Sequence, residues 1–145
     1  MDMMAGLNAS FSALHAQRTR MNVIAANLAN THSTRTPEGG PYTRKEVILG
    51  AQRYGAPFEA VLQDRLQDGL SEVHVLDIAS APNGTRLEYE PDHPDANAQG
   101  YVAYPNISVM HEMVDLISAS RAYEANVTAI NAAKDMSLRA LQIGR

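Results

Sequence analysis

The sequence predicts an α+β fold, in which long N- and C-terminal α-helices pair as a coiled-coil-like layer beside a small β-rich middle domain. Two distributions along the 145 residues carry this prediction. All seven prolines lie between positions 31 and 106, whereas all seven methionines lie outside that window. Proline is costly inside a helix and tolerated in loops and at strand edges, so the proline-free ends are expected to be helical. The expected divisions are therefore 1–30, 31–106 and 107–145.

The N-terminal segment 1–30 has the periodicity of a helix. Apolar residues recur in alternating steps of four and three from Leu7 to Leu28, with Arg18 as the one polar position. Seven alanines add helix propensity, and Asn30 suits the end of a helix about 39 Å long. The large apolar residues of this stripe are Leu7, Phe11, Leu14, Met21 and Leu28.

The C-terminal segment repeats the pattern over a longer stretch. A helix over 107–143 would reach about 55 Å, with Asn106 or Ser108 as its cap and Glu112 in its first turn. Seven of the ten positions reached by the same stepping from Val109 are apolar. A helix of this length needs a packing partner along most of it. The principal apolar residues of this second stripe are Met113, Leu116, Tyr123, Val127, Ile130 and Leu141.

The middle segment is predicted to be β-structure joined by turns. Three short apolar or alternating stretches are the expected strands: 45–49, 70–78 and 85–89. Asn83 and Gly84 between the last two predict a hairpin, because both residues accept positive φ. Residues 90–100 are expected to form a polar loop, and 101–105 to lead into the C-terminal helix. Residues 56–69 are predicted to be a weak helix or a loop.

Composition and charge exclude several classes of protein. The chain has no cysteine, so it has neither disulfides nor a thiol nucleophile. A net charge of −4 argues against nucleic-acid binding, and no apolar run is long enough for membrane insertion. The N-terminus lacks the features of a cleaved signal peptide, so export would need another route. The acidic excess lies in the middle, where six basic and eleven acidic side chains give −5.

Two histidine motifs are candidates for metal sites. The stretch from His111 to Asp115 superficially resembles the HExxH zinc motif, but the second histidine is missing. His93 lies between Asp92 and Asp95, where neighbouring prolines favour a surface turn. In both places the polar surface interpretation is preferred, so no metal site is predicted.

The remaining polar motifs also give no catalytic site. Gly39 and Gly40 are not a phosphate loop, because Pro41 removes an amide that a phosphate would need. Basic residues cluster near the first helix and the start of the middle segment, where they are expected to solvate a helix face or to pair with acids of a neighbouring subunit. These basic residues are Arg18, Arg20, Arg35, Arg44 and Lys45. No enzyme activity, catalytic residue or cofactor is therefore predicted.

The two helical ends carry more apolar surface than they can bury against each other. They differ in length, and apolar surface left without a partner favours contact with other chains. The arms are close to electrically neutral, with net charges of +1 and 0, which permits many copies to pack side by side. The pattern is typical of an assembly subunit, in which the two apolar stripes pack between subunits.

Long motifs in both halves then point to a family. They are SALHAQR at 12–18, ANLAN at 26–30, TRTPEGGPY at 34–42, YEPDHPDA at 89–96, GYVAYPN at 100–106 and MVDLISASRAYEAN at 113–126. Through these motifs the whole chain closely resembles the bacterial flagellar rod, hook and hook-associated axial proteins. The inserted form of the third motif is similar to that of the proximal-rod type.

The resemblance implies a structural subunit of the proximal rod of the flagellar basal body. Its terminal helices would polymerise into the shaft that carries torque across the periplasm. Implied partners are copies of itself, other rod proteins, the membrane-ring adaptor and the flagellar export apparatus, which would export it without a cleaved signal. The residues that match the family signature would end the first helix and steer the chain into the middle domain. They are Asn27, Asn30, Thr36, Pro37, Gly39, Gly40 and Tyr42.

Two other functions remain open from the residues alone. One is a soluble helical adaptor or export-chaperone-like binding module, which would stay a small discrete oligomer at any concentration. The other is a metal-dependent hydrolase using His93, His111 and nearby acids, which would carry stoichiometric metal when purified.

Overall fold

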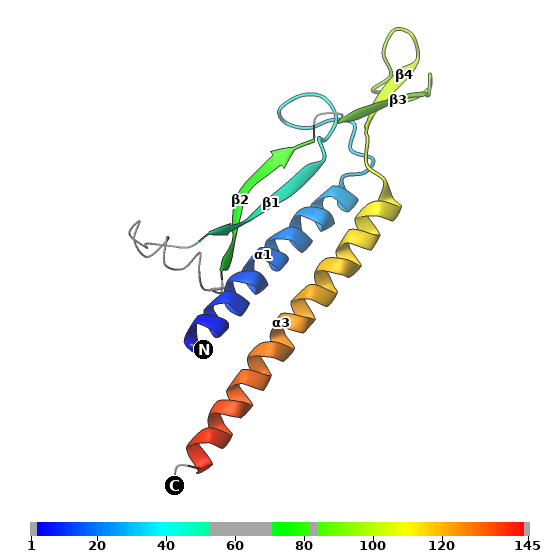
Figure 1. Cartoon of the computed structure of the whole chain (residues 1–145). Helices are drawn as coiled ribbons and strands as arrows, with labels where there is room; N and C mark the ends of the chain where they lie inside the picture. Colours follow the sequence, from blue (N-terminus) through cyan, green and yellow to red (C-terminus); the bar gives the residue numbers. More distant parts are fainter. Residues whose placement is uncertain (1–2, 53–70, 82–83, 144–145) are drawn as a thin grey trace.

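A computed structural model describes residues 3–52, 71–81 and 84–143. Two long helices run side by side in opposite directions, and two small sheets lie at one side and one end of the pair (Figure 1). Helix α1 spans Met3–Ala29 and helix α3 spans Val109–Ile143. The strands are β1 (Lys45–Gln52), β2 (Glu72–Ser80), β3 (Thr85–Tyr89) and β4 (Tyr101–Pro105). The predicted α+β fold class is confirmed.

The helix boundaries follow local backbone contacts. At the end of α1, the Thr31 hydroxyl donates to the Leu28 carbonyl at 2.8 Å, which satisfies an acceptor that the helix leaves open. Ser108 directly precedes α3, and its carbonyl accepts the amide hydrogen of Glu112 at 3.0 Å. The helix therefore begins two residues later than position 107, since the Ile107 amide is turned back to the Pro105 carbonyl.

The four strands form two separate antiparallel pairs. Strand β1 pairs with β2 from Lys45 opposite Ser80 to Gln52 opposite Glu72, with an irregularity between Ile48 and Leu49. Strand β3 pairs with β4 from Thr85 opposite Pro105 to Tyr89 opposite Tyr101. Strand β1 extends three residues further than the expected 45–49, and β2 spans 72–80 instead of the expected 70–78. Residues 101–105 form a strand rather than a simple connection.

The predicted hairpin between the second and third strands is wrong, because β2 and β3 belong to different sheets. The chain on either side of the Asn-Gly turn is bonded to other segments. The Ala81 amide donates to the Arg44 carbonyl at 2.8 Å, and the Gly84 carbonyl accepts from the Asn106 amide at 2.9 Å. Asn83 itself, like the ambiguous stretch 56–69, lies outside the described residues.

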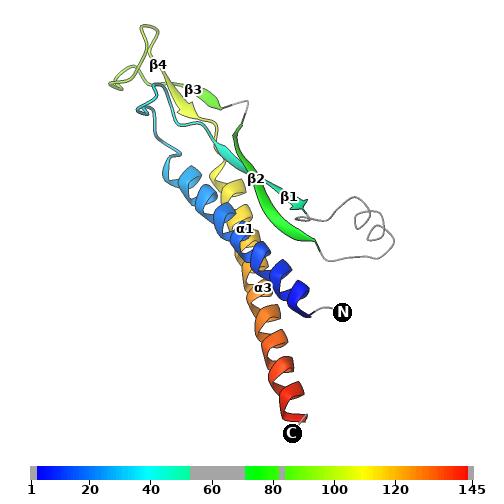
Figure 2. The same ribbon diagram turned by 90° about the vertical axis from the view of Figure 1, so that its left-hand side faces the viewer.

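Helix α1 is the central element of the fold. It packs against α3 on one side and against β1 and β2 on another, as the two perpendicular views show (Figures 1 and 2). Ala16 and Ile24 of α1 and Ala119 of α3 are buried. The small side chains of Ala16 and Ala119 let the backbones of neighbouring elements approach α1 and α3 closely, so this core is thin.

The β3–β4 pair packs mainly on neighbouring loops. Tyr104 is buried with its ring edge-on to His32 and His93, at centroid distances of 6.3 and 6.2 Å. Its hydroxyl donates to Glu90 at 3.0 Å. These contacts anchor the β3–β4 sheet to the loop that follows α1.

Among the described helices, neither is apolar enough over a sufficient length to cross a membrane.

Candidate functional site: a polar junction at the helix ends

The end of α1, the start of β1 and the first turn of α3 meet at one buried amide side chain. Asn27 is completely buried and uses its full hydrogen-bonding capacity. Its Nδ2 donates to the Lys45 carbonyl at 2.8 Å and to Glu112 Oε2 at 3.0 Å. Its Oδ1 accepts from the Lys45 amide at 3.0 Å and from the Tyr42 hydroxyl at 3.1 Å. The Asn27 side chain thus bonds residues that lie 15, 18 and 85 positions further along the sequence.

Glu112 supplies the charge of the junction. The side chain is 1% exposed, and its Oε1 accepts from Arg44 Nε at 2.7 Å. Arg44 also lies 3.6 Å from Glu46, through Nη1. A buried carboxylate is retained only when it is paired and hydrogen-bonded, and removing its partner is strongly destabilising. We call Asn27, Tyr42, Arg44, Lys45 and Glu112 the polar junction.

Proton binding within the polar junction follows from its burial and charge. Partial burial lowers the pKa of Arg44, but the hydrogen bond to Glu112 and the nearby carboxylates outweigh this effect and raise it above its ordinary value. Burial, with the charge of Glu112, raises the pKa of Tyr42. The guanidinium therefore stays charged and the phenol stays protonated near neutral pH, as their hydrogen bonds require.

The loop between α1 and β1 is closed by its own backbone. The Thr36 amide and hydroxyl both donate to the Gly40 carbonyl, at 2.8 and 3.1 Å, and the Gly39 amide donates back to Thr36. Gly39 and Gly40 have φ values of 91° and 79°, which L-residues with a Cβ rarely adopt. The Tyr42 amide then donates to the Ser33 carbonyl at 3.0 Å, which brings the chain back to the end of α1. The loop thereby delivers Tyr42 and Arg44 to the polar junction.

The residues of the family signature fall into three places. Asn27 and Tyr42 lie in the polar junction and bond each other. Asn30 lies at the end of α1, where its Nδ2 donates to the Ala26 carbonyl at 2.9 Å. The other four, Thr36, Pro37, Gly39 and Gly40, form the turn at the tip of the loop.

Sequence patterns do not indicate the roles of two members of the polar junction. From its position alone, Glu112 is expected only to favour the start of its helix, and Arg44 to solvate a helix face or to pair with another subunit. That expectation for Arg44 is wrong, because its partner is Glu112 of the same chain. Arg20 likewise lies 3.7 Å from Asp115 within the chain. No local sequence pattern predicts these ion pairs, because the two residues of each pair are distant in sequence.

The predicted subunit-packing residues of α1 lie beside, rather than on, the most buried line of this helix. On α1 the buried positions are Ala16, Ile24 and Asn27, displaced from the predicted stripe. Most of the predicted residues are half-buried: Leu7, Leu14, Met21, Leu28, Leu116, Tyr123, Val127 and Ile130. The other three, Phe11, Met113 and Leu141, are 56%, 51% and 71% exposed. The single chain therefore leaves part of both stripes in solvent.

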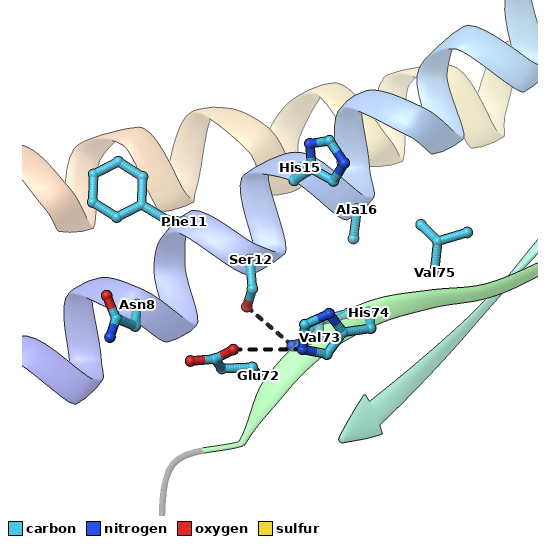
Figure 3. Close-up of a pocket in the computed structure, with 9 residues that line it drawn as sticks. All are labelled: Asn8, Phe11, Ser12, His15, Ala16, Glu72, Val73, His74 and Val75. Atoms are coloured by element: carbon cyan, nitrogen blue, oxygen red, sulfur yellow. Dashed lines mark hydrogen bonds and ion pairs between the residues drawn. The ribbon is translucent and has the colours of Figure 1, made fainter. Parts of the chain in front are cut away.

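A groove of about 380 Å³ lies between α1 and β2, lined by polar and apolar side chains (Figure 3). Ser12 stands at its centre, where its hydroxyl accepts from the Val73 amide at 3.0 Å and donates to the Ala9 carbonyl at 2.8 Å. The first bond attaches β2 to the helix and the second lies within α1, so both hydrogen-bonding roles of this hydroxyl are structural. His74 lies 3.4 Å from Glu72 at the strand end of the groove.

The two histidines considered as metal ligands are in unrelated settings. His93 packs against Tyr104 in the loop after β3, and His111 is exposed on the first turn of α3. Within the described residues, no three histidine or acidic side chains are grouped so that they could hold a metal ion.

Comparison with known proteins finds flagellar families, and the matched segments include Asn27 and Glu112 of the polar junction. Residues 7–34 match the family described as flagella basal body rod protein, and residues 98–143 match the one described as flagellar basal body rod FlgEFG protein C-terminal. Proteins named flagellar basal-body rod protein FlgC are similar over nearly the whole chain. The one from Bacillus subtilis is 46% identical over 96% of both chains. The one from Borreliella burgdorferi is 42% identical over 99% of this chain and 98% of the relative. The one from Salmonella typhimurium is 42% identical over 92% of both.

Proposed function

The chain belongs to the family of flagellar basal-body rod proteins, and from this premise we propose that α1 and α3 polymerise with neighbouring subunits into a torque-bearing shaft. Within this family the chain is a structural subunit of the rod rather than an enzyme. It assembles with other rod components of the basal body. Its two helices are the surfaces through which neighbouring subunits would meet.

The observation that carries the proposal is the incomplete burial of the two helices. Phe11 on α1 and Met110 and Ile117 on α3 are 56%, 72% and 54% exposed. Exposed methionine, isoleucine and phenylalanine side chains along a helix favour aggregation of a monomer, and in an assembly they form contacts between subunits. Burying such side chains between subunits stabilises the contact by about 25 cal/mol for each Å² of apolar surface removed from water.

The polar junction would give this shaft its stiffness. It connects both helices to the start of β1 through one buried hydrogen bond, one part-buried hydrogen bond and an ion pair. A force applied along α3 would therefore reach α1 and the β1–β2 sheet without passing through a flexible connection. Buried networks of this kind favour one arrangement of the elements over alternatives, which suits a subunit that must transmit torque.

Finer features of the role are also proposed. We expect the subunit to act in the periplasmic part of the rod and to be exported through the flagellar export apparatus without loss of an N-terminal signal. We further expect it to meet the membrane-ring adaptor at one end of the rod. The neutral helical arms support side-by-side packing, whereas the acidic middle segment would face outward.

A substitution on α1 tests the assembly role. Phe11→Glu places a charge on a side chain that is mostly exposed in the single chain, so the isolated protein should keep its helicity by circular dichroism. Isolated basal bodies should contain at least tenfold less of this variant than of the unaltered protein, and swimming should be lost. The matched control is Asn22→Glu, which adds the same charge to an exposed polar position of α1. Normal incorporation and swimming of the Phe11 variant would contradict the proposal.

A further inference from the structure

We propose that the first two turns of α3 receive the C-terminal end of α3 from a second copy of the chain. The receiving surface is Met110, Met113, Val114 and Ile117, here called the outer stripe. The inserted segment is 137–143, here called the overhang. The inference rests on the proposed function and specifies which faces of the helices meet.

The overhang follows from the register of the helix pair. Asn27 contacts Glu112, and the helices are antiparallel with equal rise per residue. Counting away from this contact places the first residue of α1, Met3, opposite about position 136 of α3. Figures 1 and 2 both show α3 continuing beyond the start of α1. Within the part of the chain that the structure describes, no helix of the same molecule therefore lies beside α3 beyond about Ser137.

The overhang continues the line of α3 residues that face α1. Ile130 and Ser137 lie on that line and are half-buried, and Leu141 lies one turn further along it. Past Ser137 the line becomes solvent-exposed, and Leu141 is 71% exposed. The same apolar face that packs inside the chain thus extends past its internal partner, and continuity of this interface calls for a helix from another molecule.

The outer stripe lies on the opposite side of α3. Met110, Val114 and Ile117 follow one another at steps of four and three, and Met113 lies beside Val114, so the four share a face. At about 100° per residue this face points away from Glu112 and Ala119. Met110 and Val114 are 72% and 64% exposed. The stripe is eight residues long from Met110 to Ile117, close to the seven residues of the overhang. The two surfaces therefore match in length and in apolar character.

The charges around the two segments are also complementary. Residues 109–124 contain three acidic side chains and one basic side chain, for a net charge of −2. Residues 134–143 contain Lys134, Asp135 and Arg139, for a net charge of +1. Opposite net charge favours this pairing over the pairing of two outer stripes with each other.

The proposed contact is heterologous, because one copy contributes its first turns of α3 and the other its last turns. A contact of this kind does not close on itself and generates a continuing array, as a rod requires. It cannot form within one chain, since Met113 and Leu141 are separated by about 42 Å along a straight helix. Any covalent link between these positions must therefore join two molecules.

Cysteine crosslinking tests the pairing, because the chain contains no cysteine. Met113→Cys and Leu141→Cys are introduced into separate full-length copies with tags of different mass, which are produced together and oxidised in cells. Basal bodies are then isolated and analysed without reductant. We expect mixed 113–141 disulfides to exceed 113–113 and 141–141 disulfides at least fivefold. Val114→Cys replaces Met113→Cys if the latter is not incorporated.

The matched control is Thr128→Cys paired with Leu141→Cys. Thr128 is exposed and lies about five turns beyond Met110 on the same face of α3, outside the outer stripe. Its mixed disulfide should be at least fivefold weaker. Predominant 113–113 disulfides, equal crosslinking by the control, or no disulfide in basal bodies that contain both variants would each overturn the pairing and leave the rod function standing. Absence of the unaltered protein from basal bodies would instead contradict the proposed function.

Discussion

The two ends of the helix pair differ in how complete they are within a single chain. At one end, Asn27 and Glu112 are buried, and their polar groups are bonded to the same molecule. At the other end, Leu141 and the rest of the overhang extend beyond α1. From this difference we infer that the polar junction stabilises the folded subunit before assembly, whereas the exposed faces of the helices would act in contact with neighbouring subunits. Substitutions at the first end should therefore affect folding, whereas those at the second should affect assembly.

The largest expected effect is that of Glu112→Ala. This change removes the buried carboxylate that Arg44 bonds and one acceptor of Asn27, so the free energy of unfolding should fall by about 3 kcal/mol. Urea titration followed by circular dichroism measures it. The matched control is Glu124→Ala, at an exposed glutamate of the same helix, which should change stability by less than about 0.5 kcal/mol. Equal effects of the two variants would remove the distinction between the ends of the pair.

Asn27→Ala is expected to have the next largest effect. The truncated side chain can no longer bond the amide and carbonyl of Lys45, and the buried Glu112 carboxylate loses a donor, so the loss should be about 2 kcal/mol. Asn22→Ala provides the control, because Asn22 is exposed on the same helix. Hydrogen exchange should show faster exchange of the Lys45 amide in the Asn27 variant alone. An unchanged Lys45 amide would show that Asn27 does not hold the start of β1.

The sequence predicts much of this fold but little of the polar junction, and the reason is distance along the chain. Helices are visible in local periodicity, and the strand at 85–89 is visible in local alternation. The partners of β2 and β3 are not, because alternation indicates a strand without naming its neighbour. Arg44 and Glu112 are 68 residues apart, so no spacing rule connects them. Asn27 and Tyr42 are indicated by their match to a family signature, and only the structure shows that they touch.

The third prediction concerns pH at the polar junction. The pKa of Tyr42 is raised in the folded chain, so its stabilising contribution is complete below its ordinary value of 10.0 and is lost as the pH rises through the folded pKa. Tyr42→Phe should cost about 1 kcal/mol at pH 8, through loss of the hydrogen bond to Asn27. The difference between the two proteins should shrink above pH 10. Arg44, whose pKa is also raised, stays charged throughout this range.

Urea titrations of both proteins at pH 8, 9, 10 and 11 measure this difference. All other ionisable groups are the same in both proteins, so their effects cancel when the curves are subtracted. A constant difference across the series would mean that the Tyr42 phenol makes no hydrogen bond that depends on its proton. The outcome would weaken the role of the loop in the polar junction, without affecting that of Glu112.

The smallest effect on folding is expected at the overhang. Leu141→Ser changes a side chain that is 71% exposed, so the free energy of unfolding should shift by less than about 0.5 kcal/mol. Incorporation into basal bodies should nevertheless fall at least fivefold, because the lost apolar surface is buried only between subunits. Urea titration and immunoblots of isolated basal bodies measure the two quantities in parallel. If Leu141→Ser were as destabilising as Glu112→Ala, the overhang would already be packed within the chain, and the division between a folding end and an assembly end would not hold.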